Sequence, residues 1–163
     1  MRYYIKQKVF SWRDRFTIKD SNGQDVYFVE SELFSWGKKL YVTDRNGNEV
    51  LYIQQNVWNW LPNYSLFMHD QEVATVKKEF TFLRPRYSIL GMDWRVEGSV
   101  WAHDYEILDD DGLVASISKE WFTWGDSYEL DIQDESNALI ALGVILIIDC
   151  VMAAEAASSS SSS

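Results

Sequence analysis

The segment from residue 138 to residue 154 is apolar on every face of the helix that it would form. It reads Ala-Leu-Ile-Ala-Leu-Gly-Val-Ile-Leu-Ile-Ile-Asp-Cys-Val-Met-Ala-Ala, and Asp149 is its one charged residue. A helix that is apolar all round must be buried, either in a membrane or inside the protein. Residues 134–137 supply acids and capping side chains that fit its first turn. The surroundings of this helix therefore determine the fold.

The sequence before this segment repeats a short strand–turn–strand pattern. Residues 10–12, Phe-Ser-Trp, recur at residues 34–36, and residues 16–23 align with residues 40–47, both ending in Asn-Gly. Asn-Gly between alternating apolar runs is a strong hairpin signal, because both residues tolerate positive φ. The run from Asp109 to Gly112 is likewise predicted to be a hairpin turn. The pattern predicts about a dozen short strands in a meander, which is compatible with a barrel.

Two environments could bury the apolar helix: a bilayer or the interior of a barrel. A helix over residues 138–154 rises about 26 Å, which is short of a hydrocarbon core of about 30 Å. Asp149 would cost roughly 2.5–3.5 kcal/mol at the centre of a membrane, and no Lys or Arg follows Lys119 to flank a span. A closed barrel of about twelve strands has a lumen too wide for its own side chains to fill. We therefore predict an internal helix and no transmembrane span.

The predicted fold is mainly β: a roughly twelve-stranded antiparallel barrel wrapped around a central apolar C-terminal helix. It forms a single domain over residues 1–156, in which the helix occupies about residues 136–156. Residues 157–163 are mostly Ser and lack the apolar side chains needed to bury surface. We expect them to form a disordered tail.

The charge balance and the single cysteine restrict the compartment and the partners. The formal net charge of −10 is unfavourable for nucleic-acid binding, which relies on cationic side chains that neutralise phosphates. Cys150 is the one cysteine, so no intrachain disulfide can form. The N-terminus alternates polar and apolar residues and has no apolar signal region. We expect a cytoplasmic protein, either free or peripheral at the membrane, with no nucleic-acid partner.

Several stretches together carry a family resemblance: the opening residues 1–8, the Phe-Ser-Trp repeats, residues 83–87, and residues 128–132 running into 138–149. They resemble the YxjI / LOR family of the tubby C-terminal-like superfamily, which is related to phospholipid scramblases. The resemblance covers about residues 2–156 and implies a twelve-stranded barrel around a central helix. Tubby-like members bind phosphoinositide headgroups through basic side chains, and scramblases are membrane-associated and calcium-responsive. The resemblance to YxjI implies no activity.

Basic pairs form the first candidate site. Lys77 and Lys78 lie on a predicted strand next to the one that carries Arg84 and Arg86. This arrangement resembles the tubby-like lipid site and predicts an anion or lipid-headgroup site; the alternative is that these are solvated charges on the outer face. A second candidate at matching repeat positions comprises Arg13, Arg15, Lys38 and Lys39.

Carboxylates form two further candidates. An acidic cluster lies just before the helix, at a position that resembles that of the calcium loop in scramblases. It comprises Asp126, Glu129, Asp131 and Asp134. Calcium takes six to eight oxygen ligands, but strand alternation also puts Glu129 and Asp131 on one face without any metal. Asp149 is interpreted as a structural carboxylate that pairs with a basic group or backbone donor at the barrel mouth. The alternative is a proton or cation site.

Signatures of catalysis are scarce. His69 and His103 are far apart in the sequence, and Cys150 has no base beside it. No metal-ligand spacing, phosphate-binding glycine loop or nucleophile elbow is present, so we expect no enzyme activity and no cofactor. The sequence favours a non-catalytic binding domain that engages a lipid headgroup or a protein at the membrane face. The alternatives are a scramblase-like, calcium-responsive membrane protein and a structural barrel that binds a protein partner.

Overall fold

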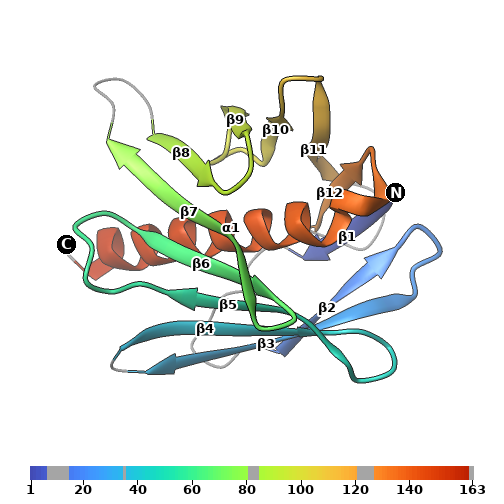
Figure 1. Cartoon of the computed structure of the whole chain (residues 1–163), viewed down its shortest axis with the longest axis horizontal. Helices are drawn as coiled ribbons and strands as arrows, with labels where there is room; N and C mark the ends of the chain where they lie inside the picture. The colour runs from blue at the N-terminus through green and yellow to red at the C-terminus, as the bar shows by residue number, and fades with distance from the viewer. Residues whose placement is uncertain (7–14, 35, 81–84, 121–126, 162–163) are drawn as a thin grey trace.

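The computed structural model of the chain describes residues 1–6, 15–34, 36–80, 85–120 and 127–161. Antiparallel strands form a closed barrel around one C-terminal helix (Figure 1). Each strand pairs with its neighbours in sequence, and β1 closes the barrel by pairing with both β2 and β12. The elements are β1 (Arg2–Lys6), β2 (Arg15–Asp20), β3 (Asp25–Phe34), β4 (Gly37–Thr43), β5 (Glu49–Gln55), β6 (Asn63–Met68), β7 (Gln71–Phe80), β8 (Pro85–Leu90), β9 (Trp94–Ser99), β10 (Asp104–Leu108), β11 (Leu113–Glu120), β12 (Ser127–Ile132), the 3-10 helix η1 (Glu135–Asn137) and α1 (Ala138–Ser161).

Strand alternation separates the barrel interior from its outer face. In β4, Leu40 and Val42 are buried, whereas Lys39 and Tyr41 between them are half-buried. In β12, Leu130 and Ile132 are fully buried. The inward side chains of the strands and the side chains of α1 form one continuous core. The predicted antiparallel barrel of about twelve strands is therefore confirmed.

The repeated Asp-x-Asn-Gly turns join strands in the predicted way. Gly23 and Gly47 have φ of 77° and 80°, in the left-handed region that a residue with a Cβ rarely adopts. Asp20 and Asp44 begin these turns, and each accepts hydrogen bonds from the backbone N–H groups two and four residues later at 2.8–3.0 Å. The same side-chain chemistry therefore closes both copies of the repeat.

Helix α1 lies inside the barrel rather than beside it (Figure 1). Residues 141, 142 and 144–148 are completely buried. A Cβ at Gly143 would lie 2.6 Å from Leu66 Cδ1, so the missing side chain is what lets α1 approach β6 this closely. The stretch 135–159 is long and apolar enough to cross a membrane, but most of it is enclosed by the strands. The prediction of an internal helix is confirmed.

The helix ends later than predicted. Residue 136 belongs to η1, and α1 runs from Ala138 to Ser161, so the expected boundaries near 136 and 156 were too early. Residues 157–161, which we expected to be disordered, are helical, and that prediction was wrong for them. Alanines at 153, 154, 156 and 157 have the highest helix propensity, and no Gly or Pro interrupts them. The hydroxyl of Ser159 also donates to the Glu155 carbonyl at 3.0 Å.

Candidate functional site

The meander places its connections alternately at the two ends of the barrel. One end, which we call the turn end, holds the connections 21–24, 44–48, 69–70, 91–93, 109–112 and 133–137. They carry eight carboxylates and one guanidinium, that of Arg45. The other end, which we call the rim end, lies where α1 ends, on the left of Figure 1. Its described connections, residues 36, 56–62 and 100–103, carry no Lys, Arg, Asp or Glu.

Carboxylates at the turn end bond to backbone groups. Hydrogen bonds from the backbone and side chain of Asn48 hold the pKa of Asp44 below its usual range. Asp109 accepts from the N–H groups of Asp111 and Gly112 at 2.8 and 2.9 Å, which confirms the predicted hairpin turn. These acids therefore serve the turns themselves.

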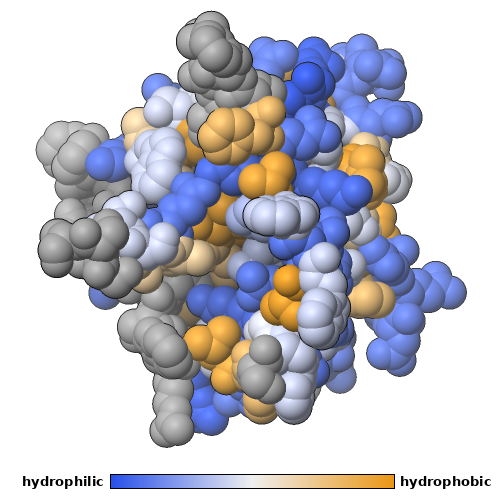
Figure 2. All heavy atoms as spheres, turned by 90° about the vertical axis from the view of Figure 1, so that its left-hand side faces the viewer, coloured by the Kyte–Doolittle hydropathy of each residue, from blue (hydrophilic) through white to orange (hydrophobic). Residues whose placement is uncertain are grey.

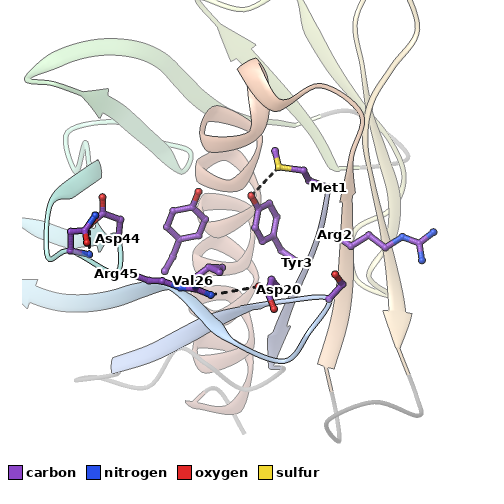
Figure 3. A pocket seen from close by; sticks show the side chains of 10 residues that line it. Met1, Arg2, Tyr3, Asp20, Val26, Asp44 and Arg45 are labelled. Carbon is purple, nitrogen blue, oxygen red and sulfur yellow. Dashed lines mark hydrogen bonds and ion pairs between the residues drawn. The ribbon is translucent and has the colours of Figure 1, made fainter.

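A groove of about 480 Å³ opens at the turn end (Figure 3). Arg45 Nη2 lies 3.5 Å from Asp20 Oδ2, and Arg45 Nε donates to the Asp25 carbonyl at 2.9 Å. The Tyr3 hydroxyl donates to Met1 Sδ at 3.4 Å. The charged side chains that line this groove, those of Arg2, Asp20, Asp44 and Arg45, thus already have partners, which makes it a poor candidate for a ligand site.

The two lysines of the first basic pair point to opposite faces of β7. Lys78 shares the inner face with Ala74 and Val76 and forms an ion pair with Glu155, near the end of α1. Its side chain is 13% exposed. Lys78 therefore ties the helix to the barrel and does not join an outer-face anion site.

Lys77 and Arg86 project from the outer face of the adjacent strands β7 and β8. In the register of these strands, Lys77 pairs with Ser88 and Glu79 pairs with Arg86. Within the part of the chain that the structure describes, neither Lys77 nor Arg86 forms an ion pair or a side-chain hydrogen bond. Arg84 lies outside the described residues. Two of the four predicted cations thus form an outer pair, and the exposed Glu79 lies on the same face, directly opposite Arg86.

The second basic candidate is dispersed. Arg15 Nη2 pairs with Glu30 Oε1 at 2.9 Å. Lys38 lies on the same side of β4 as the buried Leu40, whereas Lys39 lies on the opposite side. Arg13 is outside the described residues. The structure therefore does not bring these residues into one site.

The acidic residues predicted as a calcium site form ion pairs and hydrogen bonds with other protein groups. Arg2 Nε lies 3.7 Å from Glu129 Oε1 and 3.5 Å from Asp131 Oδ2. Asp134 caps η1 and accepts from both the backbone and the hydroxyl of Ser136. Among the described residues, no three acidic, His or Cys side chains are grouped to hold a metal ion, and Asp126 is outside that set.

Asp149 lies in a buried polar cluster. The Tyr128 hydroxyl donates to Asp149 Oδ2, and His103 Nε2 lies 3.5 Å from Oδ1. The ring of His103 stacks on that of Tyr128 with centroids 4.5 Å apart. The Tyr105 hydroxyl is also buried, and it has no hydrogen-bond partner among the described residues. Burial, together with the Asp149 carboxylate, raises the pKa of Tyr128 well above its usual range.

Sequence reasoning missed the partners of Asp149. The inward position of Tyr128 follows from its alternation with Leu130 and Ile132, so the strand pattern held that signal. His103 sits in the β9–β10 connection at φ 50°, and no local pattern connects it with a helix residue 46 positions later. The structural role predicted for Asp149 stays a prediction.

Exposed aromatic side chains gather at the rim end. Trp58 and Phe80 are 97% and 87% exposed, and Trp60 is completely exposed. Phe34 and Trp36 stack with centroids 5.1 Å apart, and both are exposed. We call these five residues the aromatic rim. Figure 2 looks onto this end and shows hydrophobic and intermediate residues mixed with hydrophilic ones across it.

The loop that carries Trp58 and Trp60 is held at its base. The Asn56 side-chain amide donates to Asn63 Oδ1 at 2.8 Å and to Ser65 Oγ at 2.9 Å. The backbone N–H of Asn56 donates to the Asn63 carbonyl at 2.8 Å. The sequence left open whether these tryptophans were core or exposed contacts; both are exposed, whereas Trp121 and Trp124 lie outside the described residues.

The fold and sequence can now be compared with known proteins. The sequence profile of the LURP-one-related (LOR) family matches residues 1–149. The chain belongs to the LOR family. A Bacillus subtilis (strain 168) relative, named "Uncharacterized protein YxjI", is 35% identical over 149 residues, which cover 91% of this chain and 92% of the relative. The X-ray structure of an Arabidopsis thaliana protein superposes with a TM-score of 0.64 at 20% identity, covering 91% of this chain and 90% of that one. The family resemblance drawn from the sequence is thus confirmed, and the Arabidopsis structure shares the fold.

Proposed function

We propose that this LOR-family protein is a non-catalytic binding module that engages anionic lipid headgroups at a membrane face. The observation that carries the proposal is the outer pair of Lys77 and Arg86, which project from β7 and β8 at diagonal positions of the register and form no ion pair among the described residues. A headgroup phosphate accepts charge-assisted hydrogen bonds from both an ammonium and a guanidinium group. Tubby-like members, which the chain resembles, bind phosphoinositides through basic side chains.

The overall net charge of −10 does not oppose a local cationic site. Lys77 is six residues along β7 from Gln71 at the turn end, a distance of about 20 Å at the rise of a strand. Salt screens exposed charges over about 8 Å at physiological ionic strength. The acids of the turn end are therefore too distant to cancel the field of Lys77 and Arg86, and Glu79, on the same face of β7, offsets one of the two charges at most.

The placement of nucleophilic and basic side chains supports a non-catalytic role. Burial raises the pKa of the Cys150 thiol to about 12, so the thiolate that would act as a nucleophile is not formed near neutral pH. His69 lies at the turn end and His103 at the rim end, with the length of the barrel between them. We therefore place binding, rather than catalysis, at the surface.

A scramblase-like function has less support. It would require α1 to leave the barrel for the membrane, which would break the ion pair between Lys78 and Glu155 and the hydrogen bond between Tyr128 and Asp149. A module that binds a protein partner has one observation in its favour, the aromatic rim, because exposed tryptophans are frequent anchors in protein interfaces.

Co-sedimentation of the detergent-free protein with vesicles tests the headgroup site. We expect binding to phosphatidylcholine vesicles that contain a phosphoinositide, and little binding to phosphatidylcholine alone, with and without calcium. The Lys77→Ala/Arg86→Ala variant should lose about 2 kcal/mol of binding free energy, or roughly thirtyfold in affinity.

The matched control removes two cations that already have partners. Arg15 pairs with Glu30 and Arg95 pairs with Glu97, each at 2.9 Å, so Arg15→Ala/Arg95→Ala should bind nearly as the parent does. Equal losses in both double variants would show that net charge alone governs the binding, and the proposal would be wrong.

A further inference from the structure

The geometry points to a docking surface: we propose that the aromatic rim seats on an anionic bilayer, with Trp58 and Trp60 inserted at headgroup depth and the turn end facing away. This inference rests on the proposed headgroup binding and adds the contact surface and the orientation of the barrel. It assigns a role to residues that the core and the turns do not use.

The first argument is exposure. A tryptophan that is wholly exposed forms almost no contacts within the fold, so folding does not explain its presence. Trp58 and Trp60 project from a single short connection, and Phe80 projects from the adjacent end of β7. The indole ring combines a large apolar body with one N–H donor, and it is enriched where one side of a surface is apolar and the other is wet.

The second argument is preorganisation. The backbone bonds of the connection 56–62 are fixed at both ends: Asn56 bonds to Asn63, and the Lys78 N–H donates to the Pro62 carbonyl at 2.9 Å. A Cβ at Gly37 would lie 2.7 Å from Val57 Cγ1, so β4 also packs tightly against this connection. The two indoles are thus presented from a supported base, which lowers the entropy that binding must offset.

The third argument is charge. The described connections of the rim end carry no acid. Cations stand just behind the aromatic side chains, and two acids accompany them on the strands, Glu32 opposite Lys39 and Glu79 opposite Arg86. Lys39 Nζ lies 5.5 Å from the Phe34 ring and 5.7 Å from the Trp36 ring, and Lys77 and Arg86 lie on the strands next to Phe80. The turn end, with its eight carboxylates, would be repelled by an anionic bilayer. This polarity favours one orientation, with the rim end toward the lipid.

The end of α1 also emerges at this side and adds no unpaired charge. Glu155 is neutralised by its ion pair with Lys78. The residues around it, from Ala153 to Ser159, are otherwise Ala and Ser. The end of α1 therefore adds no net negative charge that would repel an anionic membrane surface.

A bilayer fits these side chains better than a protein pocket does. Anchors in protein interfaces cluster in packed, desolvated patches near the centre of the contact. The rim aromatics instead come from three regions of the chain: the end of β3 with the residue that follows it in the β3–β4 connection, the β5–β6 connection, and the end of β7. Exposed aromatic side chains from several strands, with basic side chains beside them, match the membrane interface, where tryptophan and basic side chains occur together.

The experiment compares the intact protein with Trp58→Ala/Trp60→Ala on vesicles of phosphatidylcholine with phosphatidylserine. Brominated phosphatidylcholine reports insertion, because it quenches indole fluorescence on contact. The control is Leu90→Ala/Leu113→Ala, which removes two exposed apolar side chains beside the connections of the turn end. We expect the tryptophan variant to bind about tenfold or more weakly and to lose most of the quenching, while the control behaves as the parent does.

The outcomes separate this inference from the headgroup site. Unchanged vesicle binding and quenching in the tryptophan variant would overturn the docking surface, and the headgroup proposal would stand if Lys77→Ala/Arg86→Ala still abolished phosphoinositide binding. Loss of binding in the tryptophan variant alone would support the rim and overturn the headgroup pair. Capture of a protein without any vesicle binding would overturn both.

Discussion

The two ends of the barrel use their residues in opposite ways. At the turn end, polar side chains bond to the backbone: Asp20, Asp44 and Asp109 each accept two N–H groups of their own turn. At the rim end, Trp58 and Trp60 are left in solvent by a loop whose polar groups are bonded beneath them. One end is explained by the requirements of folding, and the other is not. That contrast is the reason for proposing a docking surface at the rim.

The electrostatics follow the same division. The described carboxyl groups whose pKa is lowered are Asp25, Asp44 and Asp134, and all three lie at or beside the turn end. The largest cause for Asp25 is its hydrogen bond from Lys19, at 2.6 Å. The turn end therefore contributes stability that depends on ionised carboxylates.

The largest expected effect tests whether anything near the rim end supports the fold. Tyr128→Phe removes the hydrogen bond to the buried Asp149 and should lower the free energy of unfolding by about 2 kcal/mol. Urea denaturation measures this loss. Tyr41→Phe is the control, because Tyr41 is half-buried and its hydroxyl forms no hydrogen bond among the described residues, and it should change little. Equal effects would mean that the Asp149 cluster is not a specific support.

The next effect is at the turn end. Asp20→Ala removes the acceptor of the Asn22 and Gln24 N–H groups and should cost about 1 kcal/mol in urea denaturation. Asp110→Ala removes an exposed carboxylate from a neighbouring turn and should be close to neutral. If the two variants were equally stable, the hydrogen bonds that Asp20 accepts from the backbone would not stabilise the fold, and the contrast between the two ends would be wrong.

Acid should loosen the turn end before the rim. A carboxyl group with a lowered folded pKa stabilises the protein above its ordinary pKa of 3.8, and this contribution is lost as the pH falls through 3.8 and below. Between pH 6 and pH 3, protection of the backbone amides against hydrogen exchange, relative to their intrinsic rate at each pH, should therefore be lost first in residues 44–48, beside Asp44. The Asp44→Asn variant should show a smaller change in Tm over the same range. If the backbone amides of residues 56–62 lost protection at a higher pH than those of residues 44–48, the rim end would be the more acid-sensitive end and the prediction would be wrong.

The smallest effect is the most direct test of the rim. Trp58→Ala/Trp60→Ala should change the free energy of unfolding by less than about 0.5 kcal/mol, because both side chains are already in water. Thermal and urea unfolding would measure it. A clear destabilisation would mean that these indoles pack within the fold. Their exposure could then no longer support a docking surface at the aromatic rim.

Local patterns were enough to predict most of the fold. The Asp-x-Asn-Gly turns predict their own hydrogen bonds. The absence of a polar face on residues 138–148 requires that the helix be buried, and the many predicted strands together with Asp149 favour a barrel over a membrane. The site was harder to predict. Strand alternation already separates Lys77 from Lys78, yet the ion pair of Lys78 depends on Glu155, which lies 77 positions later. The exposure of Trp58 could not be read from periodicity, because the connection 56–62 has none.

The closure of the barrel constrains the order in which the protein can be made. The amino group of Met1 donates to the Ile132 carbonyl at 2.7 Å, and the Ile132 N–H donates to the Met1 carbonyl at 2.8 Å. The outer edge of β1 therefore stays unpaired until β12 has been synthesised, and α1, which fills the lumen, is synthesised after β12. During translation the growing sheet has an open seam and an empty apolar face, a state in which exposed edges invite aggregation. Dependence of the nascent chain on chaperones is the expected consequence of a barrel whose internal helix is synthesised after all of its strands.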